Sequence, residues 1–153
     1  MRIVLDTNVL VRAVPTRDSP ATQVLNLATQ SPHILIVSEF ILAELARAMR
    51  YERVRRIHGF DDPTIDKFVG LIRDQAVVVG LPAAAPDAVV LNDPDDDPIV
   101  ATAILGQAEV LCTLDRHLRT PSVAAYCAQF RIRIVSDTEL LTDLRGHDRP
   151  TAE

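Results

Sequence analysis

The chain has 153 residues, a formal net charge of -5 and a hydrophobic content of 48%, values that are ordinary for one globular domain. No window approaches the roughly 18 consecutive apolar residues of a membrane span, and a pI near 5.3 argues against a broad nucleic-acid-binding surface. We predict one domain over residues 1–145 and a polar, disordered tail over residues 146–153. Because the N-terminal segment lacks a signal-peptide cleavage site, we expect a cytoplasmic protein without membrane contact.

Short runs rich in β-branched residues alternate with stretches long enough for helices. In chain order, the predicted strands are residues 2–5, 34–37, 76–79, 110–113 and 131–135. Each strand is a continuous apolar run, which is typical of a parallel sheet covered by helices on both faces. The alternation predicts a three-layer α/β/α sandwich around a mostly parallel sheet of about five strands.

Residues suited to N-caps precede several of the intervening apolar stretches. The predicted caps are Ser38, Asp62, Asp96 or Asp97, and Ser136 or Asp137. Residues 80–97 hold three of the ten prolines and show no clear period, so we predict a surface loop that leads into the acidic cluster at Asp95–Asp97.

Two acids stand where an open α/β sheet binds ligands, outside the carboxyl ends of its strands, and two further acidic groups are candidates to join them. Asp6 directly follows the first predicted strand, and Asp115 follows the fourth. The cluster Asp95–Asp97 opens the helix that leads into the fourth strand. Glu44 lies beside the apolar face of the helix after Ser38. If the first and fourth strands flank the point where the strand order reverses, these carboxylates converge.

Convergent carboxylates raise one another's pKa unless a cation lies between them. The four histidines are scattered, and Cys112 and Cys127 lie in apolar segments without C-x-x-C spacing, which predicts buried, reduced thiols. A site made of oxygen ligands alone favours Mg²⁺ or Mn²⁺ over Zn²⁺. Such a site supports phosphoryl transfer by a metal-activated water.

Four segments, "IVLDTNVLV", "SEFILAEL", "DDPIVATAI" and "EVLCTLDRHL", follow one another in the order and spacing of the PIN-domain family. Within that family the chain resembles the toxins of bacterial toxin–antitoxin systems, the VapC-type ribonucleases. By this resemblance the catalytic and metal-binding acids are Asp6, Glu44, Asp96 and Asp115, and the supporting groups are Asn8, Thr113 and Asp97. The segment "LDRHL" departs from the many relatives that carry a second acid after the fourth.

The resemblance implies a Mg²⁺- or Mn²⁺-dependent endoribonuclease that hydrolyses RNA phosphodiester bonds. It also implies a small antitoxin partner and a homodimer formed through early helices. The apolar residues of segments 21–30 and 65–72 are candidate interaction surfaces, although core packing explains them equally well.

The only dense basic segment follows Glu44 and contains five arginines: Arg47, Arg50, Arg53, Arg55 and Arg56. Because guanidinium groups bind phosphate oxygens in a bidentate manner, we predict that Arg47, Arg50 and Arg53 bind RNA. A solvated helix face, or a surface for an acidic antitoxin tail, explains the same segment.

Other phosphotransferases and non-catalytic roles are alternatives. A haloacid-dehalogenase-type enzyme needs a second Asp two residues after the first, where this chain has Asn8, and a late lysine, whereas the single lysine is Lys67. A receiver domain needs a lysine after the last strand, where this chain has Ser136 and Asp137. A catalytically weak PIN-like module that binds RNA or a protein stays open.

The predicted acids also have structural roles open to them. Asp6 is able to cap a helix that begins at Thr7, and Asp96 is able to cap the helix that it precedes. Glu44 is spaced to pair with Arg47 on a helix surface. Asp115 is also an ordinary turn residue.

Overall fold

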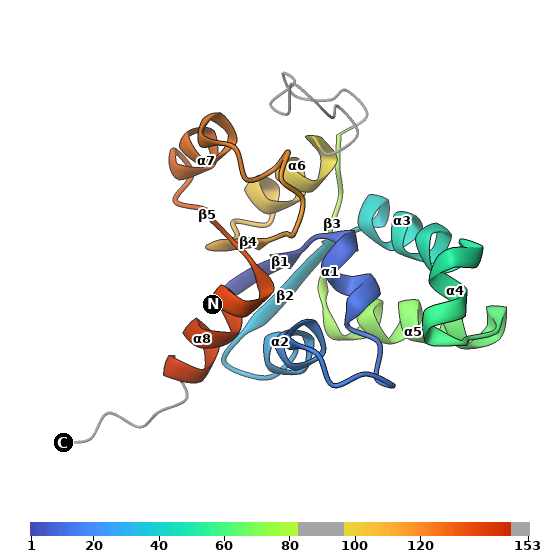
Figure 1. The fold of residues 1–153 in the computed structure, drawn as a ribbon. Coiled ribbons are helices and arrows are strands. Elements are labelled where there is room, and N and C mark those ends of the chain that lie inside the picture. Colours follow the sequence, from blue (N-terminus) through green and yellow to red (C-terminus); the bar gives the residue numbers. More distant parts are fainter. Residues whose placement is uncertain (83–96, 148–153) are drawn as a thin grey trace.

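The computed structural model describes residues 1–82 and 97–147. In this part of the chain, five strands form one sheet in the order β3-β2-β1-β4-β5 (Figure 1), and every neighbouring pair is parallel. The strands are β1 (Arg2–Leu5), β2 (Ile34–Ser38), β3 (Val77–Val79), β4 (Val110–Cys112) and β5 (Arg133–Val135). The prediction of a five-stranded parallel sheet is therefore confirmed.

The described helices occupy the connections between these strands and the C-terminal end. They are α1 (Thr7–Arg12), α2 (Pro20–Ala28), α3 (Glu39–Met49), α4 (Glu52–His58), α5 (Asp62–Gln75), α6 (Asp97–Leu105), α7 (Pro121–Ala128) and α8 (Asp137–His147). The last helix continues to His147, two residues into the predicted polar tail. Residues 83–96 and 148–153, which include most of the predicted loop and the rest of the tail, lie outside the described residues.

Side-chain caps fix the starts of several helices. The hydroxyl of Ser38 accepts a hydrogen bond from the backbone N–H of Ile41, as predicted for α3. The cap of α5 is Asp61, one residue before the predicted Asp62, because the Asp61 carboxylate accepts the Thr64 N–H at 2.9 Å. At α8, the Ser136 hydroxyl accepts the N–H of Glu139.

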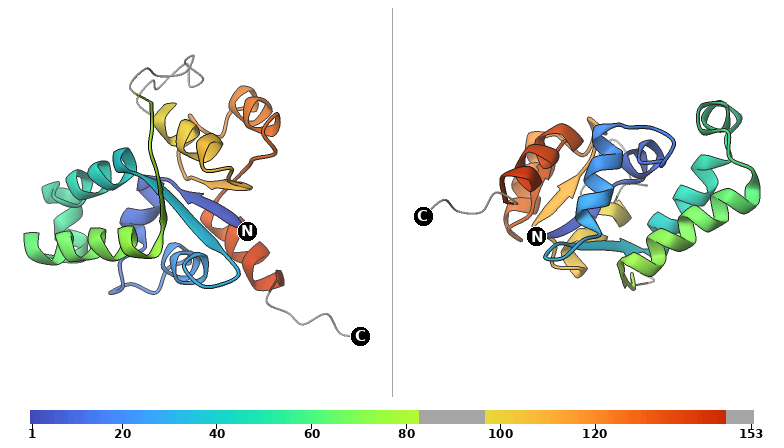
Figure 2. Two further views of the ribbon diagram at one scale, coloured as in Figure 1. Left: turned by 180° about the vertical axis from the view of Figure 1, so that it is seen from behind. Right: turned by 90° about the horizontal axis from the view of Figure 1, so that it is seen from below.

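Helices cover both faces of the sheet, which confirms the three-layer prediction. Helix α6 packs against β1, β2 and β4, while α1 packs against α2 and α3, and α2 packs against α8. Figure 1 shows α6 and α7 on one side of the sheet and α1, α2 and α8 on the other. The views of Figure 2 show α4 and α5 projecting beside α3, away from the rest of the sandwich.

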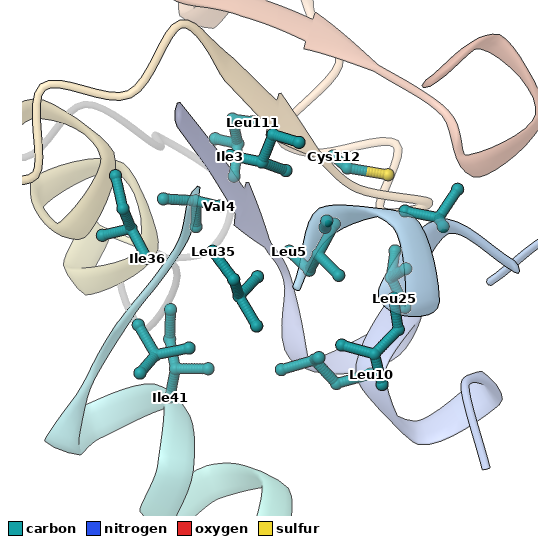
Figure 3. Close-up of a cluster of buried hydrophobic side chains, with 14 of the residues drawn as sticks. Ile3, Val4, Leu5, Leu10, Leu25, Leu35, Ile36, Ile41, Leu111 and Cys112 are labelled. Atoms are coloured by element: carbon teal, nitrogen blue, oxygen red, sulfur yellow. The ribbon is translucent and has the colours of Figure 1, made fainter. Parts of the chain in front are cut away.

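The core lies on both faces of the central strands. Figure 3 shows buried residues of β1, β2 and β4 together with Leu10, Leu25 and Ile41 from the helices, and the same cluster includes Ile99 and Ala103 of α6. Cys112 and Cys127 are buried free thiols, as predicted. Burial raises the pKa of the Cys127 thiol to about 11 and that of Cys112 further, so neither is a reactive nucleophile.

The apolar residues of the two segments predicted as interaction surfaces are largely used by this core. Val24 and Leu25 of α2 are buried, as are Ile65, Phe68 and Ile72 of α5. Core packing therefore accounts for most of both patterns. Within residues 1–82 and 97–147, no helix combines the length and the apolar character needed to cross a bilayer.

The strand order reverses between β1 and β4. The chain adds β2 and then β3 on one side of β1, and then places β4 and β5 on the other side. The backbone N–H of Asp6 donates to the carbonyl of Cys112 at 2.9 Å, so the carboxyl ends of β1 and β4 lie side by side. The predicted meeting of the first and fourth strands is confirmed.

Candidate active site

A pocket of about 700 Å³ opens at the carboxyl ends of the central strands. Three of the predicted acids line it: Asp6 after β1, Glu44 on α3 and Asp115 after β4. We call it the carboxylate pocket. Ligand sites in open α/β sheets occupy the same place, outside the carboxyl ends of strands at a reversal of strand order.

Asp6 is the most buried of these acids, with only 4% of its surface exposed. One carboxylate oxygen accepts the backbone N–H of Thr7 at 2.7 Å and so caps α1. The other oxygen accepts the Thr113 hydroxyl at 2.7 Å. Asp6 therefore does cap α1, the structural role that the sequence left open. These hydrogen bonds also fix the orientation of its carboxylate, which lines the pocket.

Thr113 connects the two acids that follow β1 and β4. Its hydroxyl donates to Asp6 and accepts the backbone N–H of Asp115 at 3.0 Å. The Asp115 carboxylate in turn accepts the N–H of His117 at 2.9 Å, as in a turn. Because Thr113 is fully buried, its hydroxyl has no solvent alternative, and the relay fixes Asp6 and Asp115 relative to each other.

Two more polar groups complete this part of the pocket. Glu44 is half-buried on α3, and its carboxylate faces the hydroxyl of Thr7 at 3.4 Å. The side-chain oxygen of Asn8 accepts the backbone N–H of Leu114 at the same distance, which ties α1 to the end of β4. Glu44 thus lies beside the first residue of α1, and Asn8 supports the pocket wall.

The electrostatics of the pocket disfavour a charged Asp6. Burial raises its pKa from 3.8 to about 6, against the opposing hydrogen bonds from Thr113 and the N–H of Thr7. The negative charges of Glu44 and Asp115 raise it further. An ion with positive charge in the pocket would remove this conflict by favouring the carboxylate.

The donors present in the pocket fit a hard divalent cation. They are carboxylate, hydroxyl and amide oxygens, which Mg²⁺ prefers, and Mg²⁺ commonly binds through one or two carboxylates while keeping several waters. Within the described residues, no three His, Cys, Asp or Glu side chains are grouped closely enough to hold one metal ion. Asp96 lies outside the described residues, as does the side chain of Asp97, the first residue of α6.

The predicted RNA-binding arginines are placed differently from one another. Arg53 on α4 lines the carboxylate pocket, whereas Arg47 and Arg50 are absent from the described residues that line it. The guanidinium of Arg50 is held by Asp62 at 3.3 Å and Asp66 at 2.7 Å. Arg50 therefore already has anionic partners on α5.

Sequence reasoning missed several residues that line the pocket: Arg12, Arg17, Tyr51, His58 and Asp137. A signal for Asp137 was available, because it comes two residues after the end of β5, but we interpreted it only as a helix cap. The signal for Arg12 was its spacing of four from Asn8, which places both on one face of α1. Arg17 and Tyr51 lie between helices, where periodicity gives no signal.

Removing the Thr113 hydroxyl should weaken metal binding without changing the shape of the pocket. Thr113→Val keeps the side-chain shape but removes a hydrogen bond that lowers the pKa of Asp6, so a smaller fraction of Asp6 is charged at pH 7. We expect Mn²⁺ affinity, measured by isothermal titration calorimetry, to fall by roughly 10-fold or more. Thr113→Ser, which keeps the hydroxyl, should bind like the wild type; equal affinity for the Val variant would contradict the role of the relay.

Comparison with known proteins bears on both the fold and the family. Residues 2–117 match the family model of the PIN domain. Among solved structures, the chain is similar to VapBC2 from Rickettsia felis, which was crystallised with a DNA fragment from its promoter. The TM-score is 0.59 and the sequence identity is 15%, and the match covers 89% of this chain and 98% of that chain. No curated protein matches the chain. At this identity the solved structure shows a shared fold alone, but the family model matches most of the sequence, and the chain belongs to the PIN-domain family.

Proposed function

We propose that this protein is a Mg²⁺- or Mn²⁺-dependent endoribonuclease that acts on single-stranded RNA and serves as a VapC-type toxin. One observation carries the proposal: Asp6, Glu44 and Asp115 line a single pocket at the reversal of strand order, and the charges that act on the buried Asp6 are negative. A buried acid with two further acids beside it suits a divalent ion shared with a phosphate. Family membership supports the same reaction class.

In this proposal Asp6, Glu44 and Asp115, together with Asp96, would hold the ion partly through bound water, because the three described acids are not grouped closely enough to bind one ion directly. The chemistry that the ion supplies is a more acidic water and positive charge opposite the phosphate. Thr113 and the N–H of Thr7 keep the Asp6 carboxylate in one orientation. Asp115 is held by its own backbone N–H on Thr113 and by the N–H of His117. The protein thus holds the carboxylates of Asp6 and Asp115 in fixed positions. An ion that binds to them needs little rearrangement of the protein before the reaction.

The reaction is tested by incubating the purified protein with single-stranded RNA in the presence of Mn²⁺, or of EDTA. We expect cleavage only with the divalent ion, leaving 5′-phosphate and 3′-hydroxyl ends that ligation and phosphatase treatment identify. A parallel incubation with single-stranded DNA of the same sequence measures the preference for RNA. If RNA stays intact while the protein still binds it, the chain is a PIN-like binding module and the nuclease proposal fails.

We infer a small antitoxin as the partner, from the resemblance to toxins of toxin–antitoxin systems and from the fold shared with VapBC2 of Rickettsia felis. Expression of the chain alone in a bacterial host should slow growth, and co-expression of a small protein encoded beside it should relieve the arrest. An Asp6→Asn variant is the matched control and should not slow growth. Harmless expression of an active ribonuclease would remove the toxin role.

We also propose a homodimer in a cytoplasmic setting. The exposed Leu71 on α5 and the exposed Val77 and Val78 on the edge strand β3 offer apolar surface for association. Light scattering after size-exclusion chromatography should give twice the 16.8 kDa chain mass. A monomeric mass at all concentrations would contradict the dimer and leave the active site unaffected.

A further inference from the structure

The carboxylate pocket carries positive charge as well as acids. Arg12 at the end of α1, Arg17 in the following loop and Arg53 on α4 all line it, and all three side chains are exposed. They come from three separate elements, so their presence in one pocket results from the fold and not from a basic run of sequence. Acids at the strand ends and guanidinium groups from α1, the following loop and α4 are the two kinds of charge that an RNA strand meets at a metal site.

These three arginines form no ion pairs with other described residues. Other arginines in that part of the chain are engaged by acids: Arg50, Arg55, Arg56, Arg73, Arg119 and Arg133. In a chain with a net charge of -5, acidic partners are abundant. Arginines without acidic partners beside a pocket are available to bind phosphate, which the planar guanidinium grips in a bidentate manner.

An exposed aromatic side chain lies in the same pocket. Tyr51 stands between α3 and α4, two residues before Arg53, and 51% of its surface is exposed. Exposed aromatic rings beside basic groups bind single strands, because an unpaired base stacks on the ring while the phosphates meet the cations. A duplex keeps its base faces covered and does not offer this contact.

We propose that Arg12, Arg17 and Arg53 hold the phosphates of a single RNA strand in the carboxylate pocket and that Tyr51 stacks on one of its bases. This inference rests on the proposed ribonuclease function and specifies how the substrate is gripped. It also replaces Arg47 and Arg50 by Arg12 and Arg17 in the predicted RNA-binding set.

Binding is measured separately from cleavage, in EDTA and in an Asp6→Asn background, by fluorescence anisotropy of a labelled single-stranded RNA of about 12 nucleotides. Arg17→Gln with Arg53→Gln should weaken binding by roughly 10- to 100-fold. It should also reduce the slope of log affinity against log salt by about 0.7 for each lost contact. The matched control is Arg56→Gln with Arg131→Gln, which removes the same charge from exposed positions that do not line the pocket. The control should bind within about twofold of the parent.

Stacking has its own spectroscopic test. The chain has no tryptophan and two tyrosines, so Tyr126→Phe leaves Tyr51 as the only emitter. Titration with the single-stranded RNA should quench this emission, whereas the same RNA annealed to its complement should quench it less and bind more weakly. Tyr51→Phe should bind like the parent, and Tyr51→Leu, which keeps an apolar side chain at this position, should bind roughly 5- to 100-fold more weakly.

The proposal is overturned if the pocket pair and the control pair weaken binding equally, if Tyr51→Leu binds RNA normally, or if the duplex binds as well as the single strand. It is also overturned if the arginine variants keep RNA affinity and lose only a protein partner. An absence of cleavage by the wild type would instead refute the proposed function, because these binding measurements require none.

Discussion

Asp6→Asn should abolish divalent-dependent RNA cleavage, lowering the rate by at least about 100-fold, because the substitution removes the charge of a pocket residue that we propose as a metal ligand. RNA binding in EDTA should persist or become tighter, since a negative charge that faces phosphate is lost. The measurement is a single-turnover cleavage assay beside an anisotropy titration. Asp74→Asn, which removes an exposed acid from the end of α5, is the matched control and should cleave at the wild-type rate.

Asp96→Asn extends this prediction to the residue outside the described range. Asn is as good an N-cap as Asp, so stability should change by about 1 kcal/mol or less while metal-dependent cleavage is lost. Glu44→Gln and Asp115→Asn should behave in the same way. If Asp6→Asn or any one of these three variants keeps the wild-type cleavage rate, the substituted residue is not part of the site.

The metal-free protein should lose stability as the pH rises, and Asp6 should be a main cause. Its pKa is about 6 in the folded chain and 3.8 in the reference state, so the folded state binds the extra proton between these values. The contribution of Asp6 is neutral below pH 3.8. Between pH 3.8 and pH 6 the contribution becomes unfavourable. Above pH 6 it lowers the free energy of unfolding by about 3 kcal/mol, since each unit of pKa difference corresponds to about 1.4 kcal/mol.

Asp6→Asn removes this contribution. Its amide fits the Thr113 hydroxyl less well than the carboxylate does, which costs about 1 kcal/mol. We therefore expect the variant to be about 2 kcal/mol more stable than the wild type at pH 7 and slightly less stable at pH 4. Urea unfolding at both pH values in EDTA measures the difference, with Asp74→Asn as the control. A saturating divalent ion should stabilise the wild type at pH 7 and have little effect on Asp6→Asn; an unchanged difference between pH 4 and pH 7 would contradict the raised pKa.

The fold was predictable because each strand is a short apolar run and each connection is long enough for a helix. The segments "RIVL" and "VLCT" locate β1 and β4 to within a residue, and the acids that follow them mark the carboxyl edge of the sheet. Parallel strands put those ends together once β1 and β4 are neighbours. The convergence of Asp6 and Asp115 therefore followed from strand order alone.

Other parts of the site were not predictable from local pattern. Glu44 was recognised because it lies beside the apolar face of α3, but its approach to Thr7 depends on the packing of α1 against α3. The cap of α5 shifted to Asp61 because two adjacent aspartates are equally good caps in sequence. Arg12 and Arg17 were missed because they lie outside the one dense basic run that the sequence analysis favoured. That run supplied Arg53 correctly as a pocket residue, but also Arg50, which is held by two acids of α5.

The metal site is tested most directly by locating a divalent ion in crystals of the protein soaked with Mn²⁺, using its anomalous scattering. We expect an anomalous peak in the carboxylate pocket, with an oxygen of Asp6 within about 2.3 Å and Asp115, Glu44 or Asp96 as a further ligand, directly or through water. The same soak of Asp6→Asn crystals should lack the peak. A wild-type peak at another place on the molecule, or an undiminished peak in the Asn variant, would contradict the assignment of this pocket as the metal-dependent active site.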